Sequence, residues 1–275
     1  MPVQQSIGVW ALTRRVGATA NARNISLIAA GVAFYAMLSI FPAVAAIIAL
    51  WGFISDAALV ESQLELLRSF VPQDAFDLLS AQVHALVGAN DSTLGWATIL
   101  STLIALWTTR AGVAALINGL NAVYGTEARS GLWNFIAAIL LTLVLVLIAL
   151  TALACVVIVP IVLAFIPLGD FTAQILFLSR WGLVITVVLL GLSLLYHYGP
   201  NHAARTGWVS AGAVFALILW ALASVGFSFY LSNFGNYNEV YGSIGAVIAL
   251  LMWFFISAYV VLLGGVLNAE LSRRD

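Results

Sequence analysis

The chain has 275 residues, of which 63% are hydrophobic and only 8% are charged, and its formal net charge is -1. A soluble domain carries about 25% charged residues, so this composition excludes a water-soluble globular protein and indicates an integral membrane protein. The near-neutral charge also argues against a nucleic-acid-binding protein, which would carry a basic face.

The N-terminal part of the chain predicts a surface helix followed by a first membrane span. Residues 6–21 place Trp10 near two arginines, a pattern typical of a short helix lying on the membrane surface. Residues 24–54 are apolar and long enough to cross a bilayer. Pro42 lies inside this span and removes a backbone donor, so we expect a kink near residues 39–41.

Residues 56–91 differ in kind from the apolar segments around them. Their apolar residues recur at helical spacing, and Pro72 begins a second helical stretch. The segment therefore predicts two amphipathic helices, too short and too charged to span. In one interpretation, the pair lies on lipid headgroups at the extracytoplasmic surface. In the other, it forms a lid over a cavity between the spans.

Five further apolar segments complete a predicted bundle of six transmembrane helices in one all-α domain over residues 1–275. They cover residues 94–123, 132–166, 172–198, 207–231 and 242–267. With the N-terminus inside, the inner segments hold seven arginines and the outer segments hold two. Because cytoplasmic segments carry the excess of basic residues, both termini are expected in the cytoplasm.

Small residues four positions apart predict close contacts between the late helices, because they allow two backbones to approach. The pairs are Gly207/Ala211, Gly212/Ala216 and Gly245/Ala249, and Gly264-Gly265 leaves a bare face late in the last span.

Arg110 lies well inside the second predicted span. Its guanidinium cannot be neutralised, so it needs water, an anion or carbonyl oxygens. A structural interpretation has this side chain, in the inner half of its span, reach the interface or exposed carbonyls. A functional interpretation makes it an anion or headgroup contact in a cavity, with Glu270 as its candidate ion-pair partner. Asn118 and Asn121 follow, and they either bond neighbouring helices or touch a substrate.

The link between the fifth and sixth predicted spans is a second candidate site. Its asparagines and glycines suit a tight turn at the outer surface, where tyrosines are common. Alternatively, its polar groups form the mouth of a polar pathway, with Tyr35 and Pro42 on a first span that can bend. The polar residues of the link are Tyr237, Asn238, Glu239 and Tyr241.

Catalytic and metal-binding motifs are missing from the sequence. The histidines His84, His197 and His202 have no metal-ligand spacing, and no GxSxG motif occurs. No basic groove for a nucleic-acid backbone is visible either. We therefore expect no enzymatic activity, no metal, no cofactor and no nucleic-acid partner.

Four stretches of the chain are distinctive in combination. They are AAGVAFYAMLSIFPAV (Ala29–Val44), LWTTRAGVAALINGLNAVYG (Leu106–Gly125), YHYGPN (Tyr196–Asn201), and Ser210–Leu271 with its YGSIGAVIALLMW and LLGGVLNAEL blocks. Together they resemble the YihY/BrkB family of bacterial inner-membrane proteins. The resemblance implies a multi-pass inner-membrane protein from a family with a virulence and serum-resistance association. An older ribonuclease BN label of the family finds no support in the residues.

Two functional hypotheses remain. The first is a transporter-like protein that moves a lipid, an amphiphile or a small organic molecule. No nucleotide-binding loop is present in the sequence, so a gradient, a partner or the substrate's own distribution would drive it. The second is a non-transporting envelope component that binds membrane lipids or a partner protein of the envelope.

Overall fold

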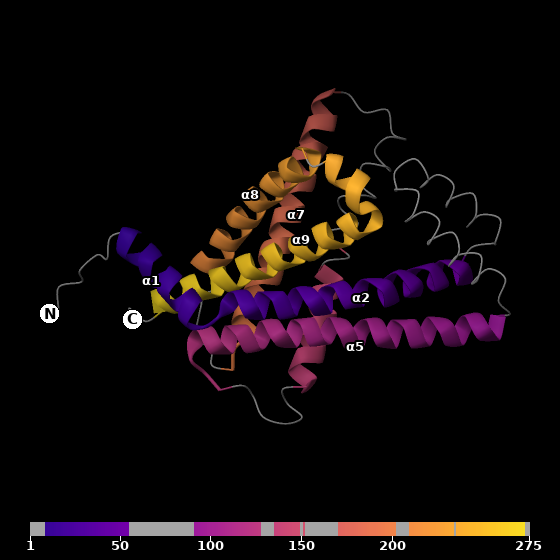
Figure 1. The fold of residues 1–275 in the computed structure, drawn as a ribbon, viewed down its shortest axis with the longest axis horizontal. Coiled ribbons are helices and arrows are strands. Elements are labelled where there is room, and N and C mark those ends of the chain that lie inside the picture. Colours follow the sequence, from indigo (N-terminus) through magenta and orange to yellow (C-terminus); the bar gives the residue numbers. More distant parts are fainter. Residues whose placement is uncertain are drawn as a thin grey trace. The chain divides into compact units, whose positions relative to one another are not determined.

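The chain is helical throughout the part that the computed structural model describes, residues 9–54, 91–127, 135–148, 151, 170–201, 209–233 and 235–272. The helices are α1 (Val9–Ala22), α2 (Ile25–Ile54), α5 (Asp91–Tyr124), α7 (Asp170–Tyr198), α8 (Ala211–Asn233) and α9 (Gly235–Ser272), drawn in Figure 1. Another apolar helix covers Phe135–Ile148. Within these ranges no strand occurs, and the predicted all-α fold is confirmed there.

Four helices contain a stretch that is long and apolar enough to cross a membrane. These stretches are Thr102–Tyr124, Trp181–Tyr198, Ala211–Ser232 and Val247–Ser272, and the bent pair of α1 and α2 would make a fifth. Each of the six predicted spans overlaps one helix of the described ranges. The number of six spans and the cytoplasmic termini stay predictions.

Some predicted features lie outside the described residues. The amphipathic pair at residues 56–91 does so, apart from Asp91, which begins α5. The later part of the third predicted span, beyond residue 151, does so as well. The lid and surface interpretations of the amphipathic pair therefore both stay open.

Contacts divide the chain into two compact units. Unit 1 contains Met1–Val32, Val113–Gly226 and Phe255–Asp275, and unit 2 contains Ala33–Gly112 and Phe227–Phe254. The boundary passes through α2, α5, α8 and α9, so each of these helices contributes residues to both units.

The core of unit 1 is built from apolar side chains of the apolar helix at 135–148 and of every labelled helix. Its largest fully buried apolar members are Ile25 of α2, Leu120 and Val123 of α5, and Leu262 and Val266 of α9. Unit 2 holds an aromatic contact between α8 and α9, where Phe227 stacks on Trp253 with ring centroids 5.4 Å apart. The core of unit 1 and the ring stack of unit 2 are both formed by packing of apolar surfaces.

The outer surface of α8 is apolar along its length. Ile218, Leu222, Val225 and Phe229 are among its exposed side chains. A continuous apolar face of this kind would associate non-specifically in water, whereas in a bilayer it meets lipid chains. The exposure pattern therefore supports the membrane class that the composition indicates.

Asn24 separates α1 from α2 by adopting a positive φ of 50°. Asparagine enters this left-handed region more readily than most residues because its short amide can bond locally. The axes of Trp10–Ala22 and Ile25–Ile40 differ by 62° as a result. α1 thus leaves the direction of the first apolar helix, as a surface helix requires.

The link before the last span is helical rather than a turn. α9 begins at Gly235, so the backbone of residues 237–241 belongs to its first turns, and the predicted tight turn there is wrong. A helix satisfies its own N–H and C=O groups beside lipid, which an open turn would leave exposed. Pro42 lies within continuous helix α2, and the kink expected near it stays a prediction.

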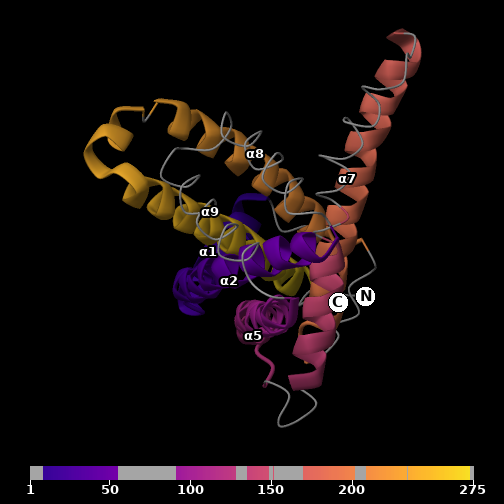
Figure 2. The ribbon, with the colours of Figure 1, turned by 90° about the vertical axis from the view of Figure 1, so that its right-hand side faces the viewer.

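The start of α8 and the end of α9 cross at glycine, and Figures 1 and 2 both show these ends converging. A Cβ atom on Gly264 would lie 2.6 Å from the carbonyl oxygen of Gly212 and 2.8 Å from the Cβ of Ala216. A Cβ atom on Gly212 would collide with the Gly264 carbonyl oxygen. The predicted close contacts of Gly212/Ala216 and of Gly264-Gly265 are confirmed.

We expect Gly212→Ala to destabilise the protein, because the new methyl group would meet backbone rather than a movable side chain. Overpacking of this kind costs about 1–3 kcal/mol. The thermal unfolding midpoint of the purified protein in detergent should fall accordingly.

Gly226→Ala is the matched control, since it makes the same change in the same helix where no atom lies within 4 Å of the new Cβ. It should leave the midpoint unchanged or raise it slightly, because alanine favours helix over glycine. Equal midpoints for the two variants would contradict the close crossing.

Candidate lipid or substrate site

Arg110 of α5 is the charged residue of the candidate site in unit 2. Its guanidinium carbon lies 5.4 Å from the ring centroid of Trp107, within the range of a cation–π interaction. Arg110 is half-buried, whereas Trp107 is 61% exposed. Arg110 lies within the apolar stretch Thr102–Tyr124, and its place in the inner half of the span stays a prediction.

Two threonines stand between Trp107 and Arg110, and both donate their hydroxyl protons within the helix. Thr108 Oγ1 donates to the carbonyl of Ile104 at 2.9 Å, and Thr109 Oγ1 donates to the carbonyl of Ala105 at 2.7 Å. Because both hydroxyl protons are donated to carbonyls of α5 itself, the two threonines need no polar partner from outside the helix for them. The guanidinium is the strongest hydrogen-bond donor of this turn.

Among the other candidate residues of unit 2, only the side chain of Tyr35 lies within the described part of the structure. Tyr35 lies edge-to-face against Phe34, with ring centroids 5.5 Å apart, and is partly exposed. The side chains of Pro42, Tyr237, Asn238, Glu239 and Tyr241 lie outside the described residues, and their proposed role stays a prediction.

Asn121 is a buried amide of unit 1 and belongs to a small hydrogen-bond network. It is 3% exposed, and its Oδ1 accepts the backbone N–H of Asn201 at 2.7 Å and the Thr126 hydroxyl at 3.1 Å. Asn201 follows α7 and donates its side-chain Nδ2 to the carbonyl of Glu127 at 2.9 Å. The amide thus ties the end of α5 to the end of α7, as the helix-bonding interpretation predicts.

Asn118 stands one turn before Asn121 but has a different environment. Its side chain is exposed, whereas Asn121 is buried. The end of α5 is fixed by Gly125, whose φ of 69° lets the Thr126 amide donate to the Asn121 carbonyl at 2.9 Å. Only Asn121 of the two candidates therefore enters the network of unit 1.

Asn268 of α9 is a buried structural position that the sequence interpretation missed. It is 3% exposed, and its Oδ1 accepts the backbone N–H of Gly212 at 2.7 Å. Its Nδ2 donates to Ser210 Oγ at 2.9 Å, and Ser210 in turn caps the first turn of α8. The signal was an amide within the long apolar run of the last span.

Tyr196 of α7 completes the crossing and was also missed. Its hydroxyl donates to the carbonyl of Val261 at 2.7 Å, and the side chain is buried. The same hydroxyl lies against Gly264, so no larger residue than glycine fits there. Tyr196 thereby connects α7 to the glycine crossing of α8 and α9.

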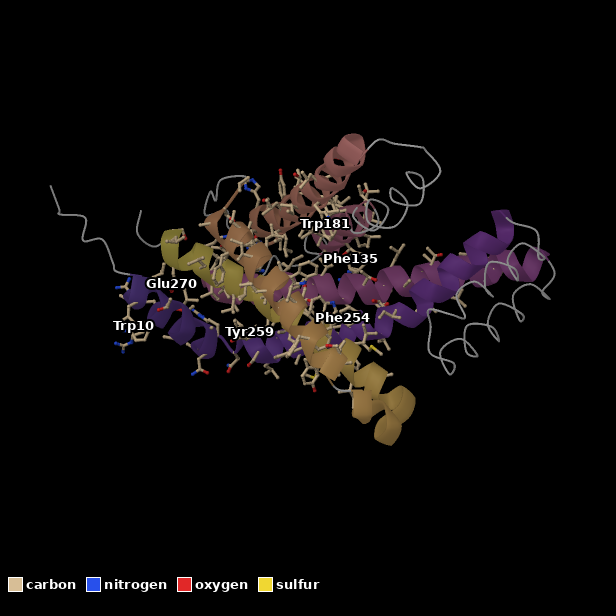
Figure 3. The ribbon with its side chains drawn as sticks, turned by 90° about the horizontal axis from the view of Figure 1, so that it is seen from above. Trp10, Phe135, Trp181, Phe254, Tyr259 and Glu270 are labelled. Carbon is tan, nitrogen blue, oxygen red and sulfur yellow. The ribbon has the colours of Figure 1, made fainter. Side chains whose placement is uncertain are left out.

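Glu270 is buried near the end of α9, where it contacts α1. It is 5% exposed, and its Oε1 accepts the Thr19 hydroxyl at 2.8 Å. Figure 3 shows Glu270 at the end of α9 and Trp10 on the neighbouring helix α1. Arg110 belongs to the other unit, so the predicted pair of Arg110 and Glu270 stays a prediction.

Three buried polar atoms of unit 1 have no hydrogen-bond partner among the described residues: Asn121 Nδ2, Tyr124 Oη and Ser193 Oγ. Such groups are costly in hydrocarbon, where no solvent replaces the partner. They mark this end of unit 1 as its most polar interior region.

Metal ligands do not gather in the described ranges, where no group of three His, Cys, Asp or Glu side chains could hold an ion. Unit 2 holds one guanidinium beside an indole, and unit 1 separately holds buried amides and hydroxyls. A guanidinium recognises carboxylate or phosphate, whereas the amides bond backbone groups of the protein itself.

Comparison with known proteins decides the family. The family model of the virulence factor BrkB matches residues 17–275. The chain belongs to the BrkB family. The resemblance carried by the four sequence stretches is confirmed, and the chain is a membrane protein of the BrkB and UPF0761 group.

Several relatives share part or most of the chain. The putative ribonuclease-like protein YfkH of Bacillus subtilis (strain 168) is 33% identical over 251 residues, which are 89% of this chain and 89% of that protein. A UPF0761 membrane protein of Xanthomonas campestris is 38% identical over 88 residues, 32% of this chain and 21% of that protein. One from Tolumonas auensis is 36% identical over 83 residues, 30% and 28% of the two chains. No solved structure matches.

We expect Asn121→Ala to destabilise the protein, because it removes the acceptor of the Asn201 N–H and of the Thr126 hydroxyl. A buried donor left without a partner costs about 1–3 kcal/mol. The thermal unfolding midpoint in detergent measures this loss.

Asn118→Ala makes the same change one turn earlier on the exposed side of α5 and should leave the midpoint nearly unchanged. If Asn118→Ala were the more destabilising variant, the assignment of Asn121 as the amide that joins α5 to α7 would be wrong.

Proposed function

We propose that this BrkB-family protein binds and moves a lipid, an amphiphile or a small organic molecule that carries an anionic group. The observation that carries the proposal is Arg110, a permanently charged side chain half-buried in an apolar stretch and placed against Trp107. A charge inside a membrane helix is expensive and commonly marks a substrate or ion pathway.

The chemistry of the pair narrows the substrate class. The planar guanidinium binds phosphate or carboxylate through two parallel hydrogen bonds, which an ammonium cannot provide. The exposed indole of Trp107 offers an apolar body beside this charge. An amphiphile with an anionic head and an apolar tail matches both surfaces at once.

The proposal includes a location in the bacterial inner membrane, with several spans and both termini in the cytoplasm. The excess of arginines in the inner segments supports this orientation. It also includes the absence of enzymatic activity. The ribonuclease-like name belongs to the Bacillus relative, and this chain's sequence has no motif that would support such chemistry.

A non-transporting envelope component is the second candidate function. The buried amides favour it, because Asn121 and Asn268 form their hydrogen bonds with groups of the protein itself. In that case the polar interior of unit 1 is structural, and lipids or an envelope partner bind at the outer surface.

Vesicles that contain the purified protein and fluorescent phospholipid probes test the proposal. Headgroup-labelled phosphatidylglycerol should cross the bilayer faster than labelled phosphatidylcholine, and Arg110→Gln should slow this crossing by about tenfold or more. The loss of one charge-assisted contact of about 1.4 kcal/mol corresponds to that factor. Arg110→Lys should retain part of the rate, because it keeps the charge but loses the planar fork.

Arg180→Gln is the charge-matched control, because it removes an arginine of another helix, α7, that is not part of the proposed site. This variant should move the probe at the unaltered rate. Crossing that is unaffected by Arg110→Gln would contradict the proposed site. Binding of phosphatidylglycerol without any crossing would favour the envelope component instead.

A further inference from the structure

α1 has one face docked on unit 1. Ala20 is buried, Val16 packs against the core, and the Thr19 hydroxyl bonds Glu270 of α9. These residues recur at helical spacing and lie on one side of the helix. Because this side of α1 packs on unit 1, the opposite side of the helix points away from unit 1.

The opposite face of α1 is aromatic and basic. Trp10 is 77% exposed, and Arg14 stands four residues later on the same side of the helix. Arg15 is also exposed on the flank, and so is Arg23 just after the helix. The helix contains no acidic residue, so this face has an uncompensated positive charge.

The bend at Asn24 would allow α1 to lie along the membrane surface. The angle of 62° between α1 and the beginning of α2 turns α1 away from the direction of the first apolar helix. If α2 crosses the bilayer, α1 leaves it at the level of the headgroups. Tryptophan prefers that level, and arginine reaches phosphate from it.

We propose that the exposed face of α1, formed by Trp10, Arg14 and Arg15, binds anionic phospholipid headgroups. The occupant follows from charge complementarity, because an anionic leaflet attracts a basic segment beside a membrane helix. Arg14 and Arg15 contact the phosphates, and the indole of Trp10 lies among the glycerol and upper acyl groups. This surface is independent of Arg110 and of the proposed transport.

The test compares lipid binding by the full-length protein in detergent, measured by native mass spectrometry with added phosphatidylglycerol or phosphatidylcholine. The unaltered protein should prefer phosphatidylglycerol, and the double variant Arg14→Gln/Arg15→Gln should bind it about tenfold more weakly. Arg14→Lys/Arg15→Lys should retain most of the binding, because the charge is kept. Arg180→Gln is the control that removes one charge of α7, and it should leave phosphatidylglycerol binding unchanged.

Folding is controlled separately, because both arginines are exposed and their replacement should not move the unfolding midpoint without lipid. The unaltered protein offers a second measurement: raising the salt from about 50 mM to about 500 mM should weaken phosphatidylglycerol binding strongly. Undiminished binding by the double glutamine variant would overturn the proposal. Equal affinity for phosphatidylcholine, or equal binding of soluble polyglutamate, would overturn it as well.

Discussion

The amide of Asn268 holds the start of α8 against the end of α9, and the arrangement of unit 1 depends on this contact. The first N–H groups of a helix have no partner within the helix, and at a buried helix end water cannot supply one. Asn268 accepts the N–H of Gly212, while Ser210 accepts that of Ala213. The two helices can come this close only because Gly212 and Gly264 have no side chain.

The rest of unit 1 is built around that crossing by contacts of the same kind. Tyr196 donates to the Val261 carbonyl from α7, and Asn121 joins α5 to the residues after α7. The carboxylate of Glu270 accepts the hydroxyl proton of Thr19 and so attaches α1 to the end of α9. Because the hydrophobic effect does not drive helices together in lipid, such hydrogen bonds and close backbone contacts help to determine which helices become neighbours.

Much of the fold follows from the sequence, since apolar runs in a chain with few charges can only become membrane helices. Gly212, Ala216 and Gly264 were predicted as contact points from their size and spacing, and the structure confirms them. The roles of Asn268 and Tyr196 were not predicted, because their partners lie more than fifty residues away in the chain. The turn expected before the last span is helix, since asparagine and glycine signal a turn in water more reliably than beside lipid.

The candidate residues include two kinds of polar group, one in each unit, with different requirements. The buried amides of unit 1 find partners within the protein, so their identity follows from packing that a sequence does not reveal. Arg110 was recognisable from the sequence, because a charge in an apolar helix stands out. Its contact with Trp107 became visible only with the structure. The guanidinium remains charged whatever surrounds it, and this property makes Arg110 the residue on which the functional account depends.

Water access to position 110 tests that account most directly. In a Cys155→Ser background, Arg110→Cys should react with a small charged thiol reagent in intact vesicles, because the account places a polar pathway there. Ile104→Cys, on a different exposed face of the same helix, should react much more slowly, since lipid covers it. Equal protection of both positions would contradict the account, because Arg110 would then face lipid or closed protein rather than a polar pathway.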